Sequence, residues 1–135
     1  MDQTAFSPIA LLTSCLILGA CAPRTPEEFA AKIADRMTAK GPEQLSGGAT
    51  LGPAKAKGDT LIVEMDRMPN RHASIPYEDR IRSMQRVACN EFTDFLGAGG
   101  TVRMEGRMNS GHRLPPVIVK HCDPNRAPDA APGKA

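Results

Sequence analysis

Residues 76–108 read PYEDRIRSMQRVACNEFTDFLGAGGTVRMEGRM, and within them the spacing of apolar side chains changes from helical to extended. Over residues 76–96 they recur every three or four positions, which predicts an amphipathic helix whose buried stripe comprises Ile81, Met84, Ala88, Phe92 and Phe95 or Leu96. Residues 97–100 end this helix. Residues 101–108 alternate, which predicts a half-buried strand with an inner face of Val102, Met104, Gly106 and Met108.

Three further segments are expected to be strands. Residues 49–56 are a candidate edge strand, and residues 60–68 alternate well enough to predict a stronger one. The turn at residues 109–111 predicts a hairpin into residues 114–120, whose apolar centre at residues 117–119 suggests burial on both faces. Pairing should end or bulge just before Cys122, because that residue would otherwise share a face with Lys120.

A second helix is expected ahead of these strands. Residues 25–28 (TPEE) match a capping box with proline at the first helical position, and Phe29, Ile33 and Met37 form a thin apolar stripe. The element order α-β-β-α-β-β predicts an α+β fold, in which helices cover one face of a small antiparallel sheet of about four strands. Because residues 117–119 look interior, we expect the strand order 1-2-4-3.

The N-terminal segment has a distinctive apolar pattern. An apolar run over residues 8–20 is too short to span a bilayer core and ends in Leu18-Gly19-Ala20-Cys21. This pattern resembles the lipobox of bacterial prolipoproteins. The resemblance implies that residues 1–20 are a signal peptide that is removed, and that Cys21 is acylated and becomes the N-terminus. A buried N-terminal helix or an uncleaved anchor is the alternative.

The same resemblance implies a place in the cell and a division of the chain. Alanine rather than aspartate follows Cys21, which is compatible with an outer-membrane anchor that faces the periplasm. Residues 21–24 would then be the lipidated N-terminus and tether, and residues 25–123 one small domain. The proline- and alanine-rich residues 124–135 are expected to be a disordered tail.

Two of the four cysteines remain for the domain, because Cys15 leaves with the signal peptide and Cys21 carries the lipid. In an oxidising compartment the remaining pair, Cys89 and Cys122, predicts a disulfide. In the chain-entropy model such a bond stabilises a domain by about 3 to 4 kcal/mol. The alternative, a zinc site with His112 and His121, has poor ligand spacing.

Composition and motifs argue against several functions. The formal net charge of +2 is small and dispersed, and one tyrosine, four phenylalanines and no tryptophan offer few stacking platforms, so no nucleic-acid partner is expected. Residues 97–100 follow a helix and precede a strand, which is the reverse of a phosphate-binding loop. The sequence also lacks a Gly-x-Ser-x-Gly elbow. We expect no catalytic residues, cofactor or metal, although a small envelope enzyme stays an alternative.

The methionines leave a second alternative open. Thioethers select Cu(I), and a periplasmic copper carrier could use a set comprising Met65, Met68, Met104, Met108, His72 and His112. The simpler interpretation is that these methionines fill the core, since several fall on inward strand positions.

A basic patch is the remaining candidate site. Arg80 and Arg86, with Arg67 and Arg71 in the preceding segment, could bind an acidic partner or anionic lipid. The alternative is a solvated helix face. By elimination, the sequence favours a lipid-anchored envelope protein that acts by binding a protein partner, as an accessory subunit of an envelope assembly or secretion complex.

Overall fold

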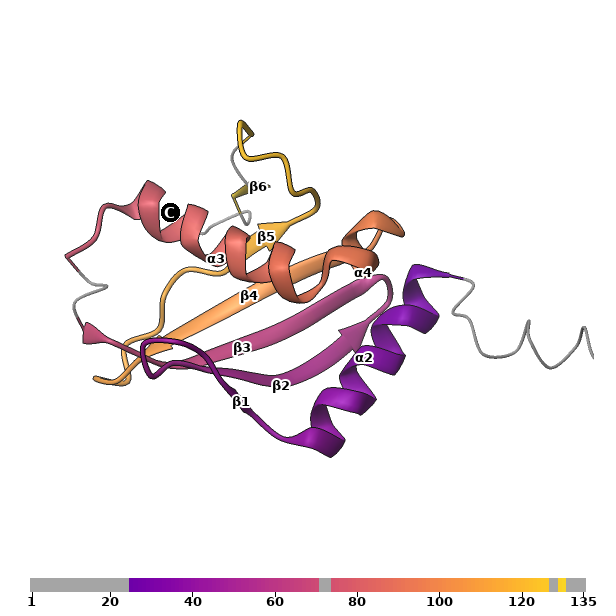
Figure 1. Cartoon of the computed structure of the whole chain (residues 1–135), viewed down its shortest axis with the longest axis horizontal. Helices are drawn as coiled ribbons and strands as arrows, with labels where there is room; N and C mark the ends of the chain where they lie inside the picture. Colours follow the sequence, from indigo (N-terminus) through magenta and orange to yellow (C-terminus); the bar gives the residue numbers. More distant parts are fainter. Residues whose placement is uncertain (1–24, 71–73, 127–128, 131–135) are drawn as a thin grey trace, which may run out of the picture.

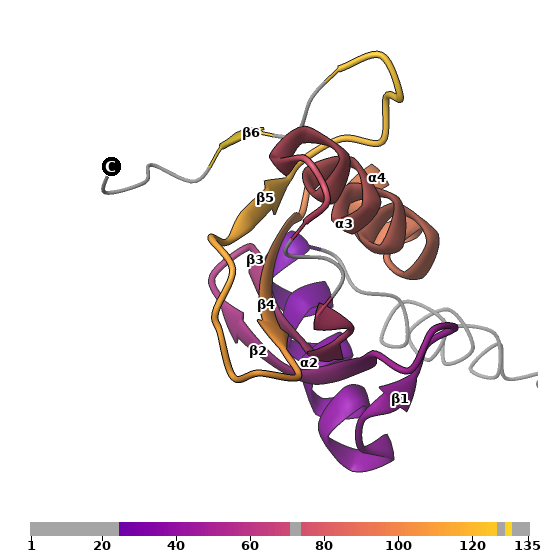
Figure 2. The ribbon, with the colours of Figure 1, turned by 90° about the vertical axis from the view of Figure 1, so that its left-hand side faces the viewer.

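The computed structural model describes residues 25–70, 74–126 and 129–130 of the 135-residue chain. Its elements, in chain order, are α2 (Pro26–Lys40), β1 (Glu43–Gln44), β2 (Thr50–Lys57), β3 (Thr60–Met68), α3 (Tyr77–Glu91), α4 (Thr93–Gly97), β4 (Thr101–Met108), β5 (Val117–Val119) and β6 (Asp129–Ala130). The strands form one sheet, and the helices lie on one of its faces (Figures 1 and 2). Within the described ranges, no helix has the length and apolar character needed to cross a membrane.

The sheet is mixed and follows chain order. Strand β3 pairs with β4 in parallel, with Thr60 opposite Thr101 and Met65 opposite Gly106, and the other neighbouring strands pair antiparallel. The unit β3-α3-β4 is therefore a helical crossover that returns the chain beside the strand it left.

The predicted antiparallel sheet with order 1-2-4-3 is wrong in both respects, although the α+β class and the single helical face are confirmed. The error came from treating residues 117–119 as buried on both faces. Val117 and Val119 are buried, but Ile118 is only half-buried, on the face opposite the helices. Strand β5 therefore lies outside β4, and the two-residue strand β6 pairs along its outer side.

The core lies between the sheet and the helices, and the predicted alternation places it. Leu61 and Val63 of β3 and Val102 and Met104 of β4 are fully buried, while their sequence neighbours face the other side. Gly100 joins α4 to β4 under the ring of Phe95; a Cβ atom there would lie 2.3 Å from that ring. Close packing at this junction therefore requires glycine.

Local signals set the helix ends. Thr25 Oγ1 accepts a hydrogen bond from the Glu28 backbone N at 3.2 Å, as the capping pattern predicts. The expected helix over residues 76–96 is interrupted at Phe92, whose φ of −126° separates α3 from α4. The Thr93 hydroxyl donates to the Cys89 carbonyl at this break. The buried stripe nonetheless continues across it into Phe95 and Leu96.

In the C-terminal part, strand β5 is shorter than the sequence predicts, and ordered structure extends further along the chain. Because Pro115 and Pro116 have no backbone N–H to donate, β5 begins at Val117 rather than Leu114. It ends at Val119, before Cys122, as expected. Part of the expected disordered tail pairs with the sheet instead, since Asp129 lies opposite Ile118.

Candidate functional site

The two long helices cover different strands and leave a hollow between them. Helix α2 packs mainly on β2, whereas α3 packs on β4 and β5. The short α4 contacts both helices and closes the gap only at one end of the sheet (Figure 1). The inner faces of β2 and β3 therefore form the floor of an incompletely covered core.

The larger part of this hollow lies between α2 and the junction of α3 with α4, and measures about 530 Å³. One wall is the apolar stripe of α2, formed by Phe29, Ile33 and Met37, each of which is only half-buried. The opposite wall includes Phe92 and Phe95. The rings of Phe29 and Phe95 meet edge to face, with centroids 5.6 Å apart, which holds the two walls in place.

A second hollow of about 280 Å³ adjoins the first, and both are lined by Asn90 and Glu91. Its lining includes Met65, Met68 and Met84, and Val87 of α3. Flexible methionines suit a surface that must repack around a bound segment. We call the two hollows together the interhelical groove.

The rim of the groove has opposite charges on its two sides. Arg36 and Lys40 line it on α2, while Glu91 and Asp94 line it at the α3–α4 junction. Lys40 also pairs with Glu43 at 3.4 Å, but both side chains are largely exposed, and such pairs contribute only about 0 to 1 kcal/mol. Because Glu43 also lines the α2 side, a bound segment would meet two cations and one carboxylate there and two carboxylates on the opposite side.

The apolar stripe on α2 is visible in the sequence, whereas the groove beside it is not. One feature points to the groove: the only buried residues of α2 are the small Ala30 and Ala34, which pack against the sheet. The larger Phe29, Ile33 and Met37 pack against the edge of the core and stay only partly buried.

Of the predicted basic residues that the structure describes, Arg80 and Arg86 point in different directions from α3, and Arg67 lies on β3. Arg80 is half-buried, with its guanidinium carbon 5.8 Å from the centre of the Tyr77 ring. Arg86 is exposed and, six residues further along α3, points about 120° away around the helix. Arg67 is exposed near the end of β3, and Arg71 lies outside the described residues. Arg82 is the arginine closest in direction to Arg86.

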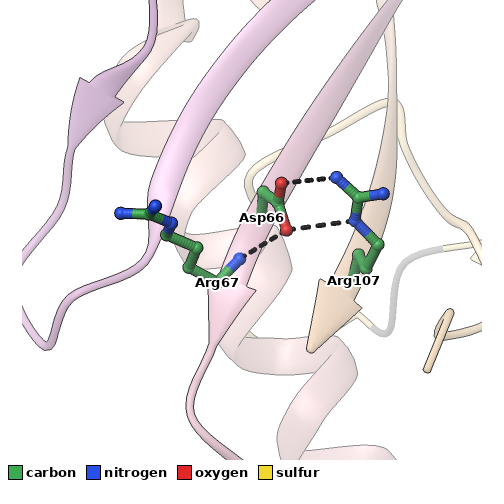
Figure 3. Close-up of polar contacts among 3 residues, drawn as sticks. All are labelled: Asp66, Arg67 and Arg107. Carbon is green, nitrogen blue, oxygen red and sulfur yellow. Dashed lines mark hydrogen bonds and ion pairs between the residues drawn. The ribbon is translucent and has the colours of Figure 1, made fainter. Parts of the chain in front are cut away.

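We call the face of the sheet that the helices leave uncovered the open face. On it, a separate ion pair joins the ends of β3 and β4 (Figure 3). Arg107 donates to both carboxylate oxygens of Asp66, from Nε at 3.1 Å and from Nη2 at 2.6 Å, and the Arg67 backbone N donates to Oδ1 at 2.7 Å. The hydrogen bonds from Arg107 and then from Arg67 lower the pKa of Asp66 from 3.8 to about 2. The carboxylate also raises the pKa of Arg107. The ion pair therefore links the two parallel strands β3 and β4.

The predicted covalent and metal sites have different outcomes. Cys89 and Cys122 form a disulfide with Cα atoms 5.6 Å apart, which ties α3 to the segment after β5. Cys21 and His72 lie outside the described residues. The methionines of the copper alternative are buried in the core at Met65, Met68, Met104 and Met108. Among the described residues, no three of the His, Cys, Asp or Glu side chains gather as a metal site would require.

Comparisons with known proteins identify the fold. No family model and no curated protein matches the chain. Among solved structures, it is similar to the type II secretion system pilotin AspS from Vibrio cholerae, with a TM-score of 0.60 and 22% identity over 73% of this chain and 92% of that one. It is also similar to the pilotin EpsS from the Vibrio vulnificus type 2 secretion system, with a TM-score of 0.59 and 17% identity over 74% and 94%. The chain therefore shares the fold of these two pilotins.

Proposed function

We propose that this protein is a pilotin-like accessory subunit of a secretion complex in the bacterial envelope, anchored by a lipid on Cys21. The observation that carries the proposal is the fold shared with two type II secretion pilotins over more than nine-tenths of their chains. The lipobox-like sequence at Leu18-Gly19-Ala20-Cys21 supports the anchor independently. A binding role also fits a chain in which sequence motifs for catalysis are lacking.

The interhelical groove is the surface we assign to the partner. Burying the exposed minority of Phe29, Ile33 and Met37 would contribute at most about 0.5 to 1 kcal/mol each, about a third of the value of fully burying such side chains. A groove walled by helices suits an amphipathic helix that inserts its apolar face. Because of the charges on the rim, this helix should carry acidic residues toward Arg36 and Lys40, and basic residues toward Glu91 and Asp94.

The anchor is tested by metabolic labelling with a fatty acid. The thioether to lipid can form only at Cys21, so Cys21→Ala should abolish labelling and leave an unprocessed or mislocalised precursor. Cys15→Ala, in the same N-terminal segment, is the matched control and should label normally. Equal labelling of wild type and Cys21→Ala would contradict the anchor.

The partner is tested by crosslinking in intact cells, followed by recovery of the protein and identification of what is attached. Ile33→Gln, in the groove, should remove a secretion-complex subunit from the recovered material and reduce secretion by that complex. Ile62→Gln is the matched control, because Ile62 is also half-buried but lies on the opposite face of the sheet. Recovery that is the same for both variants would contradict the groove as the binding site.

A further inference from the structure

The start of α2, the α4–β4 connection and the β2–β3 turn lie at one end of the domain. A Cβ atom on Gly99, in the α4–β4 connection, would lie 3.9 Å from Cγ of Pro26 at the start of α2. The Thr101 backbone N donates to the Asp59 carbonyl at 3.0 Å, which joins the β2–β3 turn to the start of β4. Figure 1 shows α2 beginning beside this end of the sheet, where β3 and β4 also begin.

The tether to the membrane is short. Three residues separate Cys21 from Thr25, the cap of α2. A fully extended chain advances at most about 3.6 Å per residue, so a lipid on Cys21 would lie within about 14 Å of Thr25. The inference that follows rests on the proposed lipid anchor, which would bring this end of the domain to the membrane surface.

On the open face of the sheet, this same end carries a row of basic and hydroxyl side chains. Lys57 of β2 lies opposite Thr60 of β3, which lies opposite Thr101 of β4. Lys120 extends the row, because it follows Val119, which pairs with Val102. We call Lys57, Thr60, Thr101 and Lys120 the cationic row.

The cationic row borders a shallow hollow of about 490 Å³, to which Arg103 and Asp59 also contribute. Two lysines and Arg103, whose charge is already paired with Glu105, therefore lie near one carboxylate, Asp59. Neither Lys57 nor Lys120 forms an ion pair within the part of the chain that the structure describes. Arg103 is held at the base of the hollow by a hydrogen bond from Nε to Glu105 at 3.0 Å.

These observations point to a phosphate-bearing ligand. Ammonium, guanidinium and hydroxyl groups all donate hydrogen bonds to phosphate oxygens, and the charged donors make the strongest of these bonds. A shallow, open hollow at the anchored end of the domain suits a headgroup presented by a surface. We propose that the cationic row binds the phosphate groups of anionic lipids in the membrane that holds the anchor, and so fixes the orientation of the domain on that membrane.

The test uses the mature acylated protein reconstituted into two kinds of vesicle, phosphatidylcholine alone and phosphatidylcholine with phosphatidylglycerol. A water-soluble amine reagent labels lysines, and mass spectrometry of peptides reports each site. Lys57 and Lys120 should label roughly threefold more slowly in the anionic vesicles, and high salt should remove the difference. Lys40, at the opposite end of α2 and largely exposed, is the matched control and should label equally in both.

The outcomes separate this inference from the proposed anchor. The mass of the N-terminal peptide reports acylation of Cys21, and its absence would overturn the anchor and the inference together. Acylated protein in which Lys57 and Lys120 label at the same rate in both vesicles would overturn the inference alone. Equal protection of Lys57 and Lys120 in the two kinds of vesicle would also overturn the inference, because closeness to the membrane surface alone would then explain the protection.

Discussion

The two faces of the sheet come from the same strands but have opposite characters. On the covered face, Leu61 and Val63 are inaccessible to solvent beneath the helices. On the open face, Ile62 and Glu64, which alternate with them, stay partly or largely exposed. Period-two alternation therefore builds both surfaces at once. The covered face has a groove where its helices leave the core incomplete, and we propose that it binds there, whereas the open face carries charged and hydroxyl side chains beside the half-buried Ile62 and Ile118.

The largest expected effect comes from adjacent residues on the two faces. Leu61→Ala should lower the free energy of unfolding by about 2 to 5 kcal/mol, because it opens a cavity in a closed part of the core. Ile62→Ala should cost clearly less, because its side chain is already half in water. Denaturant unfolding of both variants measures the difference. Equal losses would mean that the open face is covered in the native protein.

The disulfide links the covered face to the end of β5. Cys89→Ala should lower the free energy of unfolding by about 2 to 5 kcal/mol, the usual cost for small secreted domains. The double variant Cys89→Ala with Cys122→Ala is the control and should cost little more than either single change. Thiol alkylation followed by mass measurement checks the bond itself. Two free thiols in protein recovered from the envelope would contradict this pairing.

The sequence predicts most residues of the covered face but little of how the strands are ordered and paired. Alternation and helical spacing predict the strands and the buried stripe, and the cysteine pair follows from the resemblance of residues 18–21 to a lipobox. Alternation does not distinguish parallel from antiparallel neighbours, so the β3-α3-β4 crossover was missed. Strands β1 and β6 have two residues each and leave no period to detect. The groove was missed because it depends on how far apart α2 and α3 lie.

The open face should respond to acid through Asp66. Its pKa in the folded protein, about 2, lies below the ordinary 3.8, so the stabilisation is present above about pH 4 and is lost as the pH falls toward 2. Asp66→Asn should therefore destabilise the protein slightly at neutral pH, and most of this effect should be lost by about pH 2. Unfolding measured across this range checks it. A difference between wild type and variant that does not change with pH would contradict the ion pair.

The smallest effect is expected from the exposed side of α3. Reversing Arg80 and Arg86 to Glu should weaken partner recovery less than Ile33→Gln does, because neither arginine lines the groove and the two point about 120° apart around α3. Any weakening should be greater at low salt, as expected for charges at a contact rim. Recovery unchanged at both low and high salt would return these arginines to a solvated helix face.

The central claim is that the covered face binds the partner through its groove. A photo-crosslinking amino acid placed at Met37, in the groove, or at Ile118, half-buried on the open face, tests it directly in living cells. If the groove binds the partner, position 37 should crosslink to a subunit of the envelope secretion complex, and position 118 should not. Crosslinks to the subunit from position 118 alone, or from neither position, would contradict it.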